Sequence, residues 1–275
     1  MTSTSDRYTT TDLLRVMERL RDPQTGCPWD VSQTFDSIVP STLEECYELA
    51  AAIEQKDYLH VAEELGDVLF QVIFYAQLGA EQKLFCFNDV VHTLVDKLLR
   101  RHPHVFENGA IEGVVSQSSS VEQVESTWET IKQQERNTKR LTGVLADVPR
   151  ALPALPRAQK LQKRAASVGF DWSSSVDVMA KLQEELGELQ AAVLANAPDA
   201  IEDEMGDVLF TCVNLARHLQ VDAETSLRRS SAKFELRFRA MESLAEEREV
   251  GLGDMNTHSL EALWIEVKQR LASPD

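Results

Sequence analysis

Apolar residues recur every three or four positions along most of the chain, which is the spacing of one face of an α-helix. Leu65, Leu69 and Val72 form such a stripe. No stretch alternates convincingly between apolar and polar residues as a half-buried strand does. The pattern predicts an all-α fold. Helices are expected over residues 11–21, 41–56, 57–83, 87–101 and 121–138, and a second set over 151–166, 176–195, 199–220, 222–247 and 258–272.

Proline marks a division between these two sets. Residues 142–156, TGVLADVPRALPALP, hold three of the nine prolines. Proline removes a backbone donor and interrupts a helix. We therefore predict two tandem helical-bundle domains, an N-terminal one over residues 1–141 and a C-terminal one over 157–275, joined by a linker over 142–156.

Two local signals refine the N-terminal half. Ser41 follows Pro40 directly, and Glu44 comes three residues later, which predicts a helix that starts at Ser41 with a capping box. Residues 107–120, ENGAIEGVVSQSSS, are rich in small and polar side chains and predict a flexible loop.

The chain contains an internal repeat. The motif EExxE at Glu44, Glu45 and Glu48 returns 140 residues later (184 − 44), and ELGDVLF at 64–70 returns as EMGDVLF at 204–210 with the same offset. Downstream, the offset becomes 136 (233 − 97), a difference of about one helical turn that a shorter connection would lose. GCPW at 26–29 is more loosely similar to GFDW at 169–172. The residues related by the offset of 136 are Lys97 and Lys233, Arg101 and Arg237, Trp128 and Trp264, and Lys132 and Lys268.

The repeated carboxylates favour a metal site. Residues three or four apart share a helix face, so Glu185 and Glu188 point the same way, as do Glu204 and Asp207 on the next helix. Carboxylates crowded together need a cation, and oxygen ligands without His or Cys favour Mg²⁺, with Mn²⁺ as a substitute. The alternative is that each motif is only the solvated face of an acidic helix. Repetition in one register argues against that alternative.

The glycines inside the second acidic motif repeat as well. Gly66 and Gly206 lie inside predicted helices, where glycine costs about 1 kcal/mol relative to alanine. Their recurrence predicts a close approach of another backbone, and simple helix packing is one form of it.

The repeated basic and aromatic residues suit a phosphorylated ligand. Lys233 and Arg237 lie four residues apart on one face, and Lys268 follows Trp264 by the same interval. The cations suit polyphosphate oxygens, and Trp264 suits stacking on a base, although a tryptophan at helical spacing also fits a core position. A di-iron carboxylate bundle would need Glu-x-x-His, and none of the six histidines has a glutamate three residues before it.

Composition narrows the classes of function. The chain has 28 Lys and Arg against 45 Asp and Glu, a net charge of −17, so nucleic-acid or anionic-lipid binding is not expected. No apolar run reaches the roughly 18 residues of a membrane span, and the polar start lacks a signal-peptide pattern, so we expect a cytoplasmic protein. The four cysteines have neither zinc nor disulfide spacing.

Taken together, EExxE, the 15-residue spacer to ExxD, Lys-x3-Arg, Trp-x3-Lys, GCPWD and GFDW resemble the MazG nucleoside triphosphate pyrophosphohydrolases over nearly the whole chain. The resemblance implies an all-α fold shared with dimeric dUTPases, Mg²⁺ dependence and a homodimer. It also implies hydrolysis of nucleoside triphosphates to the monophosphate and pyrophosphate, with broad base tolerance and a role in controlling the nucleotide pool.

The resemblance also implies roles for individual residues. The metal ligands of the C-terminal half would be Glu185, Glu188, Glu204 and Asp207, with Glu184 as a candidate to accept the proton of the attacking water. Phosphate and nucleoside contacts would come from Lys181, Asn214, Lys233, Arg237, Trp264 and Lys268. The N-terminal equivalents would be the metal ligands Glu45, Glu48, Glu64 and Asp67, and the substrate contacts Lys97, Arg101, Trp128 and Lys132.

The two halves differ at two of these places. Ser41 stands where the C-terminal half has Lys181, and Phe74 where it has Asn214. We therefore expect the C-terminal half to carry most of the activity. Two other readings stay open: a helical scaffold that binds nucleotides or a partner protein without cleavage, and a dUTPase-like enzyme that selects one base.

Overall fold

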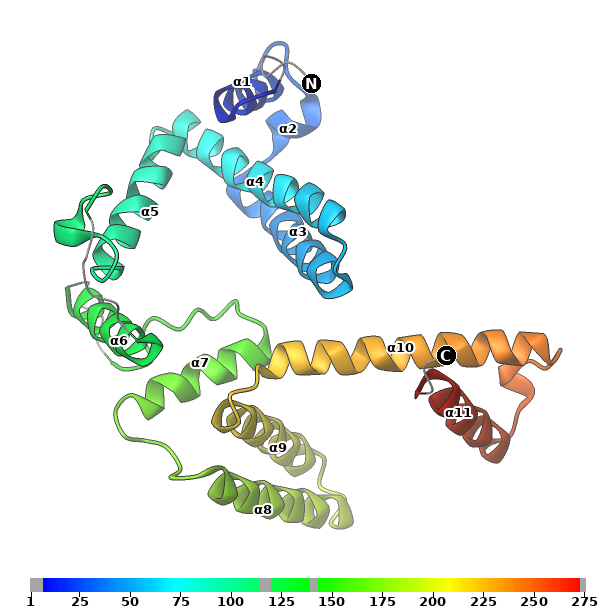
Figure 1. Ribbon diagram of the computed structural model, residues 1–275. Helices are drawn as coiled ribbons and strands as arrows, with labels where there is room; N and C mark the ends of the chain where they lie inside the picture. The colour runs from blue at the N-terminus through cyan, green and yellow to red at the C-terminus, as the bar shows by residue number, and fades with distance from the viewer. Residues whose placement is uncertain (1–6, 114–119, 139–142, 273–275) are drawn as a thin grey trace. The chain divides into compact units, whose positions relative to one another are not determined.

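The structure is a computed structural model that describes residues 7–113, 120–138 and 143–272, and every regular element in these ranges is a helix (Figure 1). The all-α prediction is confirmed. The chain divides into two compact units, residues 1–135 and 136–275. The boundary predicted between residues 141 and 142 lies outside the described residues, so the domain limits stay a prediction.

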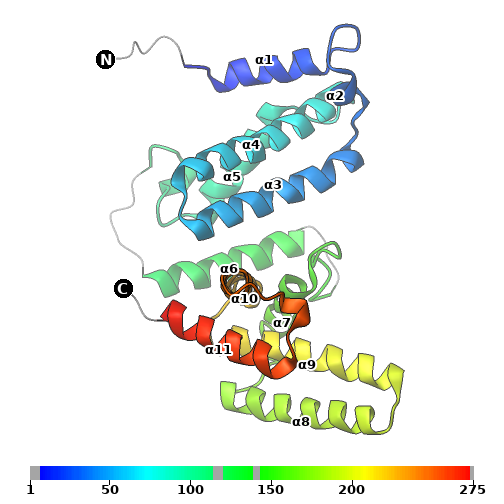
Figure 2. The same ribbon diagram turned by 90° about the vertical axis from the view of Figure 1, so that its right-hand side faces the viewer.

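The N-terminal unit is built on a helical hairpin of α3 and α4, which lie side by side in both views (Figures 1 and 2). Met17 of α1 packs with Ile38, Ile73, Phe74 and Leu78 of the hairpin in one buried cluster. Apolar stripes on three helices thus close a small core. The helices of this part of the chain are α1 (Thr10–Leu20), α2 (Pro28–Ser32), α3 (Phe35–Gln55), α4 (Tyr58–Glu81), α5 (Phe87–Arg101) and α6 (Val121–Thr138).

Helix α3 begins six residues earlier than predicted. Its N-cap is Thr34, whose side chain accepts from the backbone N–H of Ser37, and the Ser37 hydroxyl accepts from the backbone N–H of Thr34. The prediction of a capping box at Ser41 is therefore wrong. Pro40 lies inside the helix. Its fixed φ is compatible with helical geometry, and the capping box of Thr34 and Ser37 has already started the helix upstream.

The C-terminal unit repeats the hairpin with α8 and α9 and adds a long helix, α10, beside which α11 packs (Figure 1). The buried cluster of α10 and α11 contains Met241, Leu244, Ala245, Leu263 and Val267. Figure 1 shows α11 along the C-terminal part of α10, while α8 and α9 lie toward its other end. The helices are α7 (Ala154–Ala166), α8 (Ser175–Leu194), α9 (Pro198–His218), α10 (Ala223–Glu247) and α11 (Thr257–Ala272).

The sequence repeat is also a repeat of helices. Helices α3 and α8 begin 140 residues apart (175 − 35), as do α4 and α9 (198 − 58), while α5 and α10 begin 136 residues apart (223 − 87), as do α6 and α11 (257 − 121). Helix α4 has 24 residues and α9 has 21, so three of the four missing residues come from the end of α9. The lost turn therefore comes mainly from a helix rather than from the connection.

Three further predictions concern the loop over residues 107–120, the cysteines and membrane-spanning helices. The predicted loop over 107–120 contains a short 3-10 helix, Glu107–Gly109, and residues 114–119 of it lie outside the described residues. All four cysteines are free. No helix in the described part of the chain combines the length and apolar character that crossing a membrane requires.

Candidate functional site

Carboxylates from both helices of the N-terminal hairpin meet in one cluster. Glu45 and Glu48 lie one turn apart on α3, and Glu64 lies on α4. One carboxylate oxygen from each of the three lies within 4.8 Å of the other two. We call this group the N-terminal cluster; its oxygens are close enough to share one cation.

Glu64 is the buried member of the N-terminal cluster, with 6% of its surface exposed. Its Oε1 lies 2.6 Å from His60 Nε2, one turn earlier on α4. Its Oε2 is buried and has no hydrogen-bond partner. A buried carboxylate oxygen without a partner is costly, and a bound cation would supply the missing partner, so the residues fit a metal ion.

The C-terminal hairpin repeats this arrangement. Glu185 and Glu188 of α8 and Glu204 of α9 bring one oxygen each within 4.8 Å of one another, and we call them the C-terminal cluster. Glu185 is its buried member, with 5% exposed. Lys181 Nζ lies 2.8 Å from Glu185 Oε1 and 2.8 Å from Glu184 Oε1. An ammonium group thus already occupies a cation position beside this cluster.

The remaining predicted acidic residues lie at the edge of the clusters. Asp67 is exposed on α4, yet its charge acts on Glu45. Asp207 is exposed on α9 and lies outside the group of three oxygens. Glu44 and Glu184 are exposed, and only Glu184 has an ion pair among the described contacts, with Lys181.

Desolvation and the crowding of like charges raise the pKa of two cluster residues. Desolvation and the nearby charges of Asp67, Glu48 and Glu64 raise the pKa of the Glu45 carboxyl. Desolvation and the charges of Glu204 and Glu185 likewise raise the pKa of Glu188.

The pKa of Lys181, the lysine beside the C-terminal cluster, is also raised. The cause is the pair of hydrogen bonds that Lys181 donates to Glu184 and Glu185. The carboxylates of each cluster are therefore stabilised by a positive charge close to them.

The predicted nucleoside and phosphate contacts of the C-terminal half lie on α10 and α11. Arg237 Cζ lies 5.9 Å from the centre of the Trp264 ring, and Phe234 stands 5.5 Å from the same ring. Trp264 is half-buried, with a guanidinium group at its face. Lys233 and Lys268 are exposed on the same two helices. The structure therefore brings the cations and the aromatic ring of the two motifs onto neighbouring helices.

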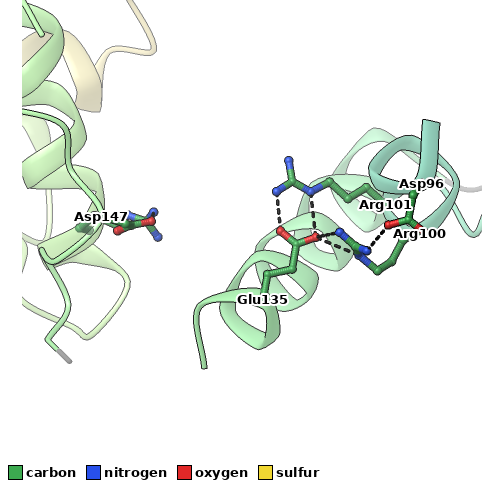
Figure 3. A network of polar contacts seen from close by, with 6 residues as sticks. Asp96, Arg100, Arg101, Glu135 and Asp147 are labelled. Atoms are coloured by element: carbon green, nitrogen blue, oxygen red, sulfur yellow. Dashed lines mark hydrogen bonds and ion pairs between the residues drawn. The ribbon is translucent and has the colours of Figure 1, made fainter. Parts of the chain in front are cut away.

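The equivalent arginine of the N-terminal half has a different partner. Arg101 and Arg100 of α5 both donate to the carboxylate of Glu135 on α6, and Arg100 also donates to Asp96 (Figure 3). These bonds, that of Arg101 first, lower the pKa of Glu135 to about 2. The residue that corresponds to Glu135 in the C-terminal half is Leu271 (135 + 136). No such acid therefore faces Arg237 from that position.

The other predicted substrate contacts of the N-terminal half are Trp128, Lys97 and Lys132. Trp128 packs edge-on against His102, with ring centres 5.2 Å apart, and its indole N–H is buried without a hydrogen-bond partner among the described contacts. Lys97 is half-buried on α5. The side chain of Lys132 lies outside the described residues.

Asn214 supports the loop before α8. It is buried on α9, and its Oδ1 accepts a hydrogen bond of 2.7 Å from Arg217. Arg217 also pairs with Asp171, which His218 contacts at 3.1 Å. These contacts run from Asn214 to the GFDW segment, and the role of Asn214 as a substrate contact stays a prediction.

Gly66 and Gly206 have open surroundings. A Cβ atom built on either glycine would meet no heavy atom within 4 Å. The expectation that another part of the chain approaches these glycines closely is wrong within each unit.

Two residues of the site escaped the sequence analysis. His60 precedes Glu64 by four positions, a spacing that places both on one helix face and was available as a signal. Glu135 lies 34 residues from Arg101 on another helix, and no sequence pattern predicts their contact.

Comparison with known proteins gives a consistent result. The model of one protein family, a MazG nucleotide pyrophosphohydrolase domain, matches the chain twice, over residues 33–106 and 174–241. The chain is 47% identical over 262 residues to a nucleoside triphosphate pyrophosphohydrolase of Escherichia coli K12, covering 94% of this chain and 96% of that one. It is 42% identical over 257 residues to a nucleoside triphosphate pyrophosphohydrolase/pyrophosphatase MazG of Thermotoga maritima, covering 94% of each chain. A nucleoside triphosphate pyrophosphohydrolase of Mycolicibacterium smegmatis is 36% identical over 191 residues, which is 66% of this chain and 55% of that one.

Proposed function

The chain belongs to the MazG family of nucleotide pyrophosphohydrolases and is an enzyme of that family, and from this premise we propose that it hydrolyses nucleoside triphosphates between the α and β phosphates. The products are the nucleoside monophosphate and pyrophosphate. The observation that carries the proposal is the C-terminal cluster, three carboxylates within reach of one cation on a hairpin that the family model covers.

The C-terminal cluster is the proposed magnesium site. Glu185, Glu188 and Glu204 would hold the ion, with Asp207 as a further ligand one turn after Glu204. The all-oxygen donor set fits Mg²⁺, with Mn²⁺ as a substitute. A bound ion would supply charge neutralisation at the phosphates and a more acidic water.

The remaining residues act on the substrate and on protons. Lys181, Lys233, Arg237 and Lys268 hold the phosphates, and Trp264 stacks on the base. Water adds to the α-phosphorus, the bond from that atom to the bridging oxygen breaks, and pyrophosphate leaves with the electron pair. Glu184, exposed beside the cluster, accepts the proton of the water. Stacking uses a ring face that every base has, so we propose broad base tolerance and a role in clearing the nucleotide pool.

The C-terminal unit carries most of this activity in our proposal. Arg101, the N-terminal counterpart of Arg237, is held by Glu135, and Ser41 offers no charge where Lys181 does. Both differences remove a phosphate-binding cation from the N-terminal half. They support a weaker or mainly structural N-terminal unit.

We further propose a homodimer. Leu65, Leu69 and Val72 on α4 are exposed along one helix face, and Met205, Leu209 and Phe210 are exposed on α9. Gly66 and Gly206 lie within these faces and leave room for close approach of another helix. A second copy would remove this apolar surface from water. The cytoplasm, where nucleoside triphosphates are made and used, is the compartment we propose.

The test is a substrate panel. Purified protein is incubated with Mg²⁺ and each common ribo- and deoxyribonucleoside triphosphate, and the products are separated. Monophosphate and pyrophosphate from several bases are the expected result. Cleavage of a single nucleotide would favour a dUTPase-like enzyme. Absence of cleavage by a folded, metal-binding protein would favour a non-catalytic scaffold.

A further inference from the structure

The two acidic clusters share their carboxylates but not their nearest positive charge. Lys181 lies one turn before Glu185, and Ser41 lies at the equivalent place one turn before Glu45 (41 + 140 = 181). Residues four apart share a helix face, so the two positions face their clusters in the same way. A lysine in one half and a neutral serine in the other give the clusters different charges.

In the C-terminal cluster, the lysine competes with a metal ion. Lys181 Nζ lies 2.8 Å from Glu185 Oε1, and Glu185 is the buried member of that cluster. A divalent ion bound by the same carboxylate would stand close to the ammonium group, and the two charges repel each other. Lys181 therefore has to leave Glu185 before the carboxylate can take a metal ion at full strength.

The N-terminal cluster has no such competitor. Within the described part of the chain, no lysine or arginine pairs with Glu45, Glu48 or Glu64. Among the described contacts, His60 pairs with Oε1 of Glu64 and leaves the buried Oε2 without a partner. Histidine in this position fixes the orientation of the carboxylate, as outer groups do around metal ligands.

We propose that the N-terminal cluster binds a divalent metal ion without nucleotide, with His60 as a positioning residue, whereas the C-terminal cluster takes up its metal ion together with a triphosphate. The triphosphate gives Lys181 a new anionic partner and so releases Glu185. The N-terminal part of this inference is independent of hydrolysis, while the C-terminal part rests on the proposed function. The N-terminal unit is then a metal-holding unit rather than a second active site.

The experiment measures bound Mn²⁺ on the full-length chain by electron paramagnetic resonance, first alone and then with a triphosphate analogue whose α–β bridge is a methylene group. Without nucleotide, binding is expected to be lost in Glu48→Gln and kept in Glu188→Gln. With the analogue, additional Mn²⁺ is expected, and Glu188→Gln is expected to lack it. Wild-type protein that fills both clusters equally without nucleotide would overturn the inference.

Two reciprocal substitutions test the role of the lysine. Ser41→Lys is expected to weaken nucleotide-free Mn²⁺ binding by about tenfold or more, because it adds a competing charge beside the cluster. Lys181→Ser is expected to make the C-terminal cluster bind Mn²⁺ without nucleotide. Unchanged binding in both variants, with circular dichroism showing folded protein, would overturn the inference.

The role of His60 has its own pair of variants. His60→Ala is expected to weaken nucleotide-free binding by about tenfold, as loss of an outer group does. His60→Gln keeps a donor for Glu64 and is expected to restore part of the affinity. Equal loss in both variants would overturn the positioning role.

The outcomes separate this inference from the proposed function. A protein that hydrolyses triphosphates but fills both clusters without nucleotide contradicts only the inference. A protein that binds Mn²⁺ at the N-terminal cluster, gains none with the analogue and cleaves no triphosphate contradicts the proposed function and the C-terminal part of the inference.

Discussion

The guanidinium carbon of Arg237 lies 5.9 Å from the centre of the Trp264 ring, so a cation and an aromatic face from two helices stand together. In the other half, the corresponding arginine is turned to Glu135 instead. The same pair of motifs therefore has two different surroundings, and this difference makes the halves experimentally separable.

The first prediction concerns Trp264. Trp264→Ala is expected to raise the KM for a nucleoside triphosphate by roughly tenfold or more, because stacking of a base on an aromatic ring is worth about 1–3 kcal/mol. Trp128→Ala, at the equivalent position of the N-terminal half, is the matched control and should leave KM unchanged. An equal rise in both variants would contradict the assignment of the nucleoside contact to the C-terminal unit.

The second prediction separates the two clusters by turnover. Glu188→Ala is expected to lower kcat by at least about a hundredfold, since a metal ligand supports several kcal/mol of charge stabilisation. Glu48→Ala is expected to keep most of the activity. Glu202→Ala, an exposed carboxylate on α9, serves as a control for loss of one negative charge. If Glu48→Ala abolishes turnover and Glu188→Ala spares it, the assignment is reversed.

The third prediction concerns the pH dependence of stability. The hydrogen bonds of Arg101 and Arg100 lower the pKa of Glu135 from 4.5 to about 2. A carboxyl with a lowered folded-state pKa stabilises the fold above its unfolded pKa and loses this effect as the pH falls toward the folded value. Replacing Glu135 by Gln should therefore cost about 1–2 kcal/mol near pH 6, after allowance for solvent screening.

Urea unfolding at pH 6 and at pH 3 measures this dependence. The difference in unfolding free energy between wild type and Glu135→Gln should shrink at the lower pH. Glu63→Gln, exposed on α4, is the control and should change little at either pH. A difference that stays constant between the two values would show that the Glu135 carboxylate is not stabilised by its arginines.

The fourth prediction addresses the proposed homodimer. Leu209→Asp places a charge in the exposed apolar face of α9, and it is expected to shift the protein toward the monomer because a charge is costly to bury. Light scattering after gel filtration measures the mass. Leu59→Asp, near the start of α4, adds the same charge outside that face. A monomeric wild type, or dissociation by Leu59→Asp alone, would contradict the proposed interface.

Most of the fold was predictable because the helices follow the apolar repeat closely. The predicted start at residue 87 and end at 101 match α5, for example. The error at α3 came from treating Pro40 as a break, while the capping pair of Thr34 and Ser37 begins the helix earlier. Local hydrogen bonds of this kind compete with the rule that proline interrupts helices.

The parts of the site formed by residues close together in the sequence were predictable. Glu185 and Glu188 share a face by periodicity alone, and the repeat pairs them with Glu204. Contacts between distant residues depend on how helices pack, which periodicity does not specify. The bond between Arg101 and Glu135 is such a contact, and it separates the two halves more sharply than the motifs do.

The short turns inside the two hairpins bear on how the protein is made. Only residues 56–57 separate α3 from α4, and only 195–197 separate α8 from α9. Contacts between segments so near in sequence give a low contact order, which is associated with rapid folding. Domains generally fold as units during synthesis, with the N-terminal one first. The first hairpin is then complete on the ribosome before the second has been translated, so the helices of the two halves that share the acidic motifs are not exposed together for mispairing.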